Sequence, residues 1–350
     1  MLPNHSQTEP ATPQPASSWN IDANEFPRRG SPRDRLRFLL RYALLAPSNH
    51  NTQPWRFRLH HDRVALYADR SRSLAAADPF DRELLISCGA ALGFLRLAAG
   101  AFGCRLAIRR FPDPDIEDLL ADAVIEENRP GVLDRELLAA ILRRRTNRNA
   151  FDPTPIAAGQ RERLNASLEG SDVHVGWIDD ANDRAQLVRI VMAADKIQFE
   201  NAAFLRELAA WIRPPLTSAQ DGIPAHAVGI SGFAAYVAPL VIRTFDIGDG
   251  KAARDEELVR RSPGIAVFST PFDTPRDWLS CGEALAAFII EAERLGLKVS
   301  YLNQPCEVSE LRFQLSLLDS IKGNPQLILR LGEANATVAP SPRRPLEDFF

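Results

Sequence analysis

The feature that most constrains the fold of this chain is an internal repeat. The string SCGAAL at residues 87–92 is matched by SCGEAL at residues 280–285, an offset of 193 residues. Gly103 and Gly296 follow the two strings at the same offset. A shared string with a shared spacing predicts that one α+β unit occurs twice in the chain. The alternative is a pair of unrelated core helices of similar composition.

The length and composition agree with two such units. The chain has 350 residues, of which 45% are hydrophobic and 25% charged, as is typical of a globular protein of about two domains. Residues 1–30 are rich in Pro, Ser, Thr, Gln and Asn, and we expect a disordered tail there. A first half then covers residues 31–130 and a second half residues 131–350, with the two joined near residues 112–135.

Apolar periodicity predicts the elements of each half. In the first half we expect helices at 33–46 and 84–100, and strands at 55–67 (with a turn at 60–63) and 104–111. In the second half we expect helices at 133–145, 161–168, 184–211 and 279–295, and strands at 173–178, 265–269 and 326–331. Residues 222–242 carry no charge but contain Pro and Gly, which indicates a buried or hinged segment rather than a membrane span.

Several classes of protein are excluded by composition and by missing motifs. The net charge is −3 with Lys and Arg dispersed, which argues against a nucleic-acid-binding face. The four Cys show no CxxC or zinc spacing and the six His are scattered, so we expect no metal site. No signal peptide is recognisable, and we expect a soluble, cytoplasmic protein. The GxGxxG, GxxxxGK[ST] and GxSxG motifs are also absent.

Two strings carry chemistry. The first, APSNHNTQPW at residues 46–55, holds Ser, Asn, Thr and Gln between two prolines, a pattern suited to the polar edge of a heteroaromatic ligand. The alternative is an ordinary connection between a helix and a strand. The second, RRRTNR at residues 143–148, suits a phosphate dianion because guanidinium groups and a hydroxyl are dense there. The alternative is that arginine is simply favourable near a helix C-terminus.

These strings resemble the FMN-dependent nitroreductase superfamily. APSNHNTQPWRF is similar to its flavin loop, and RRTNR is similar to its phosphate-binding Arg-Arg-Ser-x-Arg segment. Together with DRELLISCGAAL, SYLNQPCEV and the ending PQLILRLG…RRPLEDFF, they resemble the Acg group of that superfamily over residues 32–350. The resemblance implies an α+β, nitroreductase-like fold with mixed sheets flanked by helices.

The resemblance also implies how the site is built. Superfamily members are usually homodimers in which one subunit supplies the phosphate arginines and the other the flavin loop. Here the first half holds the loop and the second half the arginines, while residues 170–177 retain only the Trp of a second loop. We therefore expect an internally duplicated pseudo-dimer with one FMN per chain, either monomeric or paired further. The implied FMN-binding residues are Pro47, Ser48, Asn49, Asn51, Arg144, Thr146, Arg148, Asn303, Gln304, Arg343 and Arg344.

By the same resemblance, the reaction transfers hydride from NAD(P)H through FMN to a nitroaromatic or quinone-like small molecule. The protein positions the cofactor and tunes its electronics, and no side chain is assigned a catalytic role. Residues 197–242 are aromatic-rich with Gly and Pro hinges, and in the Acg group this region can act as a lid. A closed lid gives the alternative, an FMN-storage protein with little NAD(P)H activity. A third alternative is a protein without flavin that acts through interactions with other molecules.

Overall fold

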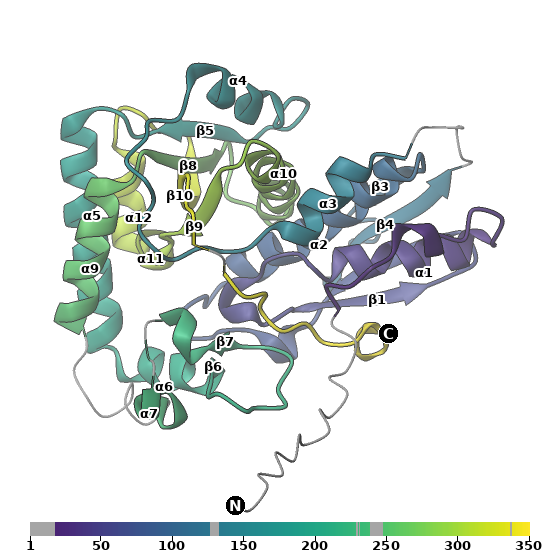
Figure 1. Ribbon diagram of the computed structural model, residues 1–350, viewed down its shortest axis with the longest axis horizontal. Helices are drawn as coiled ribbons and strands as arrows, with labels where there is room; N and C mark the ends of the chain where they lie inside the picture. The colour runs from purple at the N-terminus through teal and green to yellow at the C-terminus, as the bar shows by residue number, and fades with distance from the viewer. Residues whose placement is uncertain (1–17, 127–132, 229, 231, 239–247, 337) are drawn as a thin grey trace, which may run out of the picture.

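The fold consists of two similar α+β units and one inserted helical segment (Figure 1). The computed structural model of the chain describes residues 18–126, 133–228, 230, 232–238, 248–336 and 338–350. Two four-stranded sheets lie in it, one formed within residues 55–126 and the other within residues 174–332. A further pair of short strands lies in the inserted segment. This duplicated arrangement confirms the expected α+β class.

The first unit is an antiparallel sheet with strand order β1-β2-β4-β3. The expected hairpin is present, and the His60 N–H donates to the Arg63 carbonyl at its turn (2.8 Å). The long helix α2 separates this hairpin from β3 and β4. The elements are η1 (Ala23–Glu25), α1 (Pro32–Ala43), η2 (Asn49–Asn51), β1 (Trp55–Leu59), β2 (Arg63–Ala68), η3 (Arg70–Arg72), α2 (Arg82–Ala101), β3 (Arg105–Arg110) and β4 (Leu119–Glu126).

The second unit repeats this topology with strand order β5-β8-β10-β9. The strands of this sheet also pair antiparallel. Among the described residues, parallel pairing is found in an isolated bridge between Thr146 and Val299 and in the two short strands of the inserted segment. Its elements are α3 (Arg135–Arg143), α4 (Ala158–Ala166), β5 (His174–Trp177), β8 (Gly264–Thr270), α10 (Pro275–Arg294), β9 (Lys298–Tyr301), α11 (Gln304–Glu307), α12 (Ser309–Ser316), β10 (Asn324–Gly332) and η5 (Leu346–Phe349).

The repeated helices α2 and α10 pack directly on each other at the centre of the molecule (Figure 1). A Cβ placed on Gly89 would lie 2.1 Å from the Leu279 carbonyl oxygen, and one on Gly282 would lie 2.0 Å from that of Ile86. The repeat therefore keeps glycine where two backbones approach closely. Gly103 and Gly296 have φ of 74° and 79°, so each helix is followed by a left-handed glycine.

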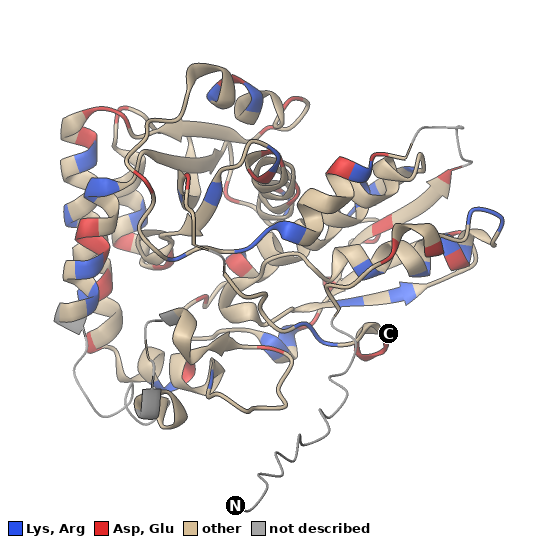
Figure 2. Ribbon diagram, in the orientation of Figure 1, with Lys and Arg blue, Asp and Glu red and all other residues tan. Residues whose placement is uncertain are grey.

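The two units differ in what joins their first two strands. Residues 60–62 connect β1 to β2, whereas residues 178–263 connect β5 to β8. This insertion comprises α5 (Ala181–Glu200), α6 (Ala202–Trp211), β6 (Ile212–Arg213), β7 (Ile223–Pro224), η4 (Ala225–Val228), α7 (Gly232–Tyr236) and α9 (Gly248–Arg261). Helices α5 and α9 pack together, and charges of both signs are interspersed along them (Figures 1 and 2).

The single helix expected over residues 184–211 is wrong, because the chain breaks at Asn201. The Asn201 side chain accepts hydrogen bonds from the N–H groups of Ala203 (2.9 Å) and Phe204 (3.4 Å), and so caps a new helix, α6. Asparagine in this role satisfies amide donors that a helix start leaves without partners. The apolar periodicity continues through the break and therefore conceals it.

The expectation of a disordered tail over residues 1–30 is wrong for residues 18–30, and residues 1–17 lie outside the described part of the chain. Ile21 and Phe26 are buried, and Phe26 stacks on Phe102 with ring centroids 4.2 Å apart. Trp19 donates from its indole nitrogen to the Ser341 carbonyl (2.9 Å). A few apolar anchors thus order a segment whose average composition is polar.

The expected junction at residues 112–135 also needs correction, because β4 at 119–126 belongs to the first sheet. Among the described helices, α2 alone is long and apolar enough to cross a membrane by length and composition. Most of its apolar window (83%) is buried inside the protein, where it packs on α10. Helix α2 is therefore a core helix of the protein.

Candidate functional site

A cavity of about 320 Å³ brings together segments from both units, the insertion and the C-terminus. The flavin-like loop, the start of α2, the arginine-rich segment after α3 and the end of β9 all line it. The insertion adds an apolar wall, to which the following residues contribute: Phe199, Phe204, Leu208, Ile212, Ile223, Pro224, Ala227, Ile230 and Leu258. Ten of the eleven residues singled out in the sequence line this one cavity, and Arg344 does not.

Pro47, Ser48, Asn49 and Asn51 reach the cavity on a loop with unusual backbone geometry. His50, Asn51 and Gln53 have φ of 47°, 55° and 52°, in the left-handed region that non-glycine residues rarely adopt. The Ser48 hydroxyl accepts from the Gln53 N–H (2.9 Å), which stabilises the turn. Asn49 donates from its side chain to Glu83 (2.7 Å), and its N–H donates to the Ser87 hydroxyl (3.3 Å).

Asn51 also fastens the loop to other segments of the chain. Its amide nitrogen donates to the carbonyls of Gly222 in the insertion (3.0 Å) and Pro342 near the C-terminus (3.1 Å). Gln53 likewise donates to the Gln220 carbonyl (3.0 Å), and the Gly222 N–H donates back to the Asn51 carbonyl (3.3 Å). The loop is therefore fastened to the insertion by three hydrogen bonds.

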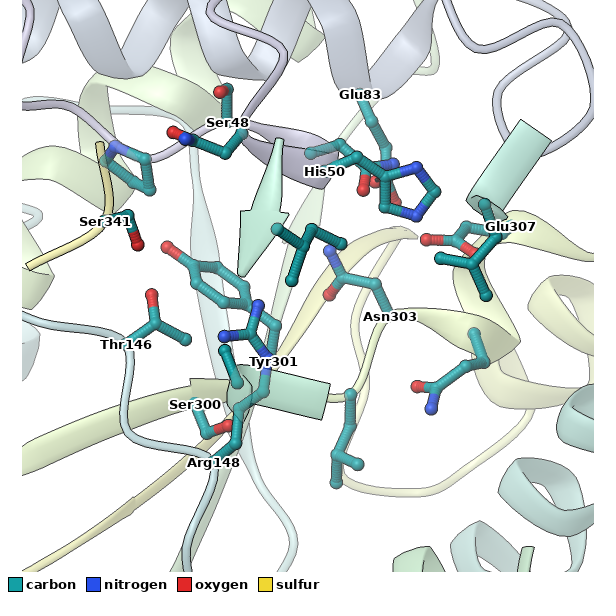
Figure 3. A pocket seen from close by; sticks show the side chains of 18 of the residues that line it. Ser48, His50, Glu83, Thr146, Arg148, Ser300, Tyr301, Asn303, Glu307 and Ser341 are labelled. Atoms are coloured by element: carbon teal, nitrogen blue, oxygen red, sulfur yellow. Dashed lines mark hydrogen bonds between the residues drawn. The ribbon is translucent and has the colours of Figure 1, made fainter. Parts of the chain in front are cut away.

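The arginines gather at one end of the cavity, which we call the arginine end: Arg144, Thr146, Arg148, Tyr301, Ser341 and Arg343. Figure 3 labels Thr146, Arg148, Tyr301 and Ser341 on this side. Within the described residues, neither Arg144, Arg148 nor Arg343 forms an ion pair with a carboxylate. Arg144 is buried and its Nε has no hydrogen-bond partner there, and the same holds for the Tyr301 hydroxyl. Three guanidinium groups without a counter-ion, beside hydroxyl groups, form a site prepared for an anion.

The pKa directions at this end have the same explanation. Burial lowers the pKa of Arg144, and burial together with Arg144 and Arg145 lowers the pKa of Arg343 well below its usual value. Arg343 donates to the carbonyls of Leu44 (2.8 Å) and Ala46 (3.1 Å), which hold it in place without neutralising it. A bound dianion would remove this electrostatic cost.

Arg344 is not part of the cavity lining, so the prediction for this residue is not supported by its position. Its guanidinium lies 4.5 Å from the Phe349 ring and donates to the Asp348 carbonyl (3.0 Å). Its backbone N–H donates to the Gln53 side chain (3.0 Å). Of these two adjacent arginines, Arg343 lines the cavity and Arg344 contacts Phe349 and Asp348 instead.

Asn303 and Gln304 line the cavity beyond β9. The Asn303 side chain accepts from the Ile328 N–H (3.1 Å), and Gln304 donates to Asp195 (3.2 Å) and Asp255 (2.7 Å) of the insertion. Their side chains thus position backbone and insertion rather than standing free. Asp195 is fully buried, and its Oδ2 has no partner among the described residues.

The sequence reasoning missed the opposite side of the cavity, where Glu83, Glu307 and His50 lie (Figure 3). Burial raises the pKa of Glu83 well above its usual value, and burial raises that of Glu307 to about 7. Burial and Arg148 lower the pKa of His50 to about 4, so this ring is neutral at pH 7. The charged start of the otherwise apolar helix, Arg82-Glu83, was the available signal.

Sequence comparisons relate the chain to known proteins. No family model matches the chain. Over 319 residues it is 31% identical to "Putative NAD(P)H nitroreductase Rv3131" of Mycobacterium tuberculosis, covering 90% of each chain. Over 328 residues it is 31% identical to "Putative NAD(P)H nitroreductase acg" of the same organism, covering 91% of this chain and 95% of that one. An uncharacterised protein of that organism, Rv3127, is 33% identical over 323 residues, covering 88% and 90% of the two chains.

Solved structures with some likeness include a nitroreductase with bound FMN from Bacteroides fragilis. It is 15% identical with a TM-score of 0.37, and the match covers 59% of this chain and 92% of that one. An NADPH:FMN oxidoreductase from Vibrio harveyi complexed with NAD+ is 14% identical with a TM-score of 0.36, covering 60% and 74%. Because these scores are low, assignment of the chain depends on the sequence relatives.

Proposed function

The chain belongs to the NAD(P)H nitroreductase family that includes acg and Rv3131, and from that membership we propose that it is an FMN-dependent NAD(P)H oxidoreductase. Bound FMN supplies hydride transfer from NAD(P)H to a nitroaromatic or quinone-like acceptor. We expect one FMN per chain and a cytoplasmic location. The chain's own residues bind and orient the cofactor and shape the space for the acceptor.

The single observation that carries this proposal is the group of guanidinium groups without counter-ions at the arginine end. Arg144, Arg148 and Arg343, with the hydroxyl of Thr146, would hold a phosphate dianion there by charge-assisted hydrogen bonds. The loop residues Pro47, Ser48, Asn49 and Asn51 would line the ring system, with Asn303 and Gln304 beyond it. The orphaned Arg144 Nε and Tyr301 hydroxyl fit a ligand rich in acceptors.

The asymmetry between the two units favours one site in each chain. The insertion between β5 and β8 walls this cavity, and the hairpin between β1 and β2 has only residues 60–62 in the corresponding place. The arginine segment at 143–148 occurs once, as does the loop at 46–55. We therefore expect the second, pseudo-symmetric position to hold no FMN.

A second candidate function, FMN storage under a closed lid, is favoured by the contacts of the insertion. Asp221 pairs with Arg72 of the first unit and with Arg213 (2.8 Å), and three hydrogen bonds join residues 220–222 to the flavin-like loop. Such a fastening would restrict nicotinamide access. Parts of the expected lid at 197–242 lie outside the described residues.

The deciding experiment is the visible absorption spectrum of the purified protein before and after anaerobic NADPH or NADH, with the released flavin identified and counted. One FMN per chain that is bleached by either nucleotide supports the oxidoreductase. One FMN that responds only to dithionite supports storage. A colourless protein that cannot be reconstituted with FMN overturns both.

A further inference from the structure

Two carboxyl groups from different units meet at the side of the cavity away from the arginine end. Glu83 lies in the first turn of α2 in the first unit, and Glu307 is the last residue of α11 in the second. Both line the cavity, and Figure 3 shows them on either side of His50. Both residues lie in strings that resemble the family, but no role was assigned to either from the sequence, and the proposed reaction has so far used neither.

Glu83 is held firmly in position. Its side chain is 3% exposed, and one carboxyl oxygen accepts from Arg82 (2.9 Å) while the other accepts from the Asn49 amide (2.7 Å). Arg82 is itself buried and also donates to the carbonyls of Gln326 (2.5 Å) and Cys306 (3.1 Å). Glu83 is therefore fixed by both the flavin-like loop and the second unit.

Glu307 is held from the insertion. Its Oε2 accepts a hydrogen bond from the Gln198 amide of α5, which leaves Oε1 without a hydrogen bond in the described structure. Lys251 of α9 acts on it only as a distant positive charge, because that amine is paired with Asp255 and Asp195. Glu307 thus combines one fixed oxygen with one that faces the cavity side.

The charges in this cluster favour a proton on one of its carboxyl groups. Glu83, Glu307 and the buried Asp78 interact with one another, and the positive charge of Arg82 acts on all three. Like charges in a buried site cannot all ionise, so at least one carboxyl keeps its proton near neutral pH. Burial raises the pKa of Asp78 as well.

An independent observation points to a polar ligand here. The Nδ1 atom of His50 is buried beside the two glutamates and has no hydrogen-bond partner in the described part of the chain. A buried polar atom without a partner is rare in native proteins and implies an unrecorded one. Because the His50 ring is neutral at pH 7, it can hold a ligand but cannot donate the excess proton.

We propose that Glu83 and Glu307 act as a proton-donating pair for the acceptor, an inference that rests on the proposed oxidoreductase function. A quinone needs a hydride and a proton to become a hydroquinone. The hydride carries both electrons from NAD(P)H by way of FMN, and the proton comes from the carboxyl pair. One carboxyl O–H bond breaks as the second O–H bond of the hydroquinone forms, and solvent then returns the proton to the pair.

The test uses the full-length flavin-loaded protein with a simple quinone such as benzoquinone as the acceptor. Glu307→Gln and Glu83→Gln keep side-chain size, and Glu310→Gln on the exposed face of α12 is the matched control. General acid catalysis is worth about 100-fold or more, so we expect kcat for quinone reduction at pH 6 to fall by about 100-fold in both active-site variants. In both variants the loss in quinone reduction should exceed any loss in flavin bleaching by NAD(P)H, whereas Glu310→Gln should leave both rates at the wild-type value.

The pH profile adds a readout that a structural role would not change. Wild-type kcat should be high at acidic pH and fall as the pH rises through about 7, because the donor must be protonated. That dependence should be absent from Glu307→Gln. Infrared difference spectra between pH 6 and pH 8, taken also without flavin, should show a protonated-carboxyl band that Glu307→Gln lacks.

The outcomes separate this inference from the proposed function. Normal bleaching with unchanged quinone reduction in both variants would overturn the proton-donating pair and leave the oxidoreductase intact. Absence of FMN would overturn the oxidoreductase and this role with it, whereas the infrared band would still report whether the pair holds a proton. Circular dichroism confirms that each variant is folded before any rate is compared.

Discussion

Replacing Gly89 by alanine tests the central packing of the molecule. The added methyl group would lie 2.1 Å from the Leu279 carbonyl oxygen, 2.9 Å from its carbonyl carbon and 3.0 Å from the Gly282 Cα. All three atoms belong to the backbone of α10, so no flexible side chain can move aside. Gly100 in the same helix is the matched control, because a methyl group there meets nothing within 4 Å.

The expected size of the effect follows from these distances. To restore an ordinary contact distance, α2 and α10 must move apart by about 1 Å. A gap of that size removes about a quarter to a half of the dispersion energy of each contact along the interface. Overpacking of this kind costs about 1–3 kcal/mol or more, against a gain of up to about 1 kcal/mol from replacing glycine in a helix. We expect Gly89→Ala to destabilise by about 2 kcal/mol and Gly100→Ala to stabilise by about 0.5 kcal/mol.

Urea unfolding followed by tryptophan fluorescence measures both variants against the wild type. The midpoint should move to lower urea for Gly89→Ala and slightly higher for Gly100→Ala, with similar slopes. Gly282→Ala should behave as Gly89→Ala does, because its methyl group would lie 2.0 Å from the Ile86 carbonyl oxygen. Equal stabilisation by all three substitutions would refute the close approach of the repeated helices.

Three further predictions concern the cavity. Arg148→Gln should weaken FMN binding about 10- to 100-fold, because it removes a charge-assisted hydrogen bond to the phosphate. The urea unfolding midpoint of the flavin-free protein should not change. Equilibrium titration with FMN and urea unfolding measure the two effects. Arg344→Gln should leave FMN affinity within about twofold of the wild type, because Arg344 lies outside the cavity lining. A larger loss of affinity would show that Arg344 does bind the phosphate. Asp221→Asn removes the ion pairs with Arg72 and Arg213, so amide hydrogen exchange over residues 212–224 should accelerate. Faster flavin bleaching by NADPH in this variant would show that the insertion limits access of the nucleotide to the cavity. Unchanged hydrogen exchange would contradict the fastening role of Asp221.

Features with a local or repeated signature could be predicted from the sequence. The two SCG strings predicted the paired helices, and the alternating apolar residues of 55–67 predicted the hairpin. The dense polar loop and the arginine run supplied seven of the ten predicted residues that line one cavity, and the family resemblance supplied Asn303, Gln304 and Arg343. Each of these strings is short and can be recognised without the fold.

The features that could not be predicted depend on long-range contacts. Glu83 and Glu307 lie far apart in the sequence, and each occupies an ordinary helical position. Trp19 and Phe26 are isolated apolar residues within a polar segment, and their burial depends on Ser341 and Phe102. The helix break at Asn201 depends on one capping side chain, whereas the apolar periodicity on either side continues.

Joining two units in one chain explains why the site is asymmetric. In a symmetric dimer of identical subunits, any insertion or lost residue must appear at both sites. In this chain the loop at 46–55 and the arginines at 143–148 are each present once, and the insertion occupies only the β5–β8 connection. Because the two units can diverge separately, one cavity could gain the apolar wall and the pairing of Glu83 with Glu307 without a matching change elsewhere. The tight α2–α10 contact, which needs glycine in both copies, is the part of the duplication that must stay symmetric.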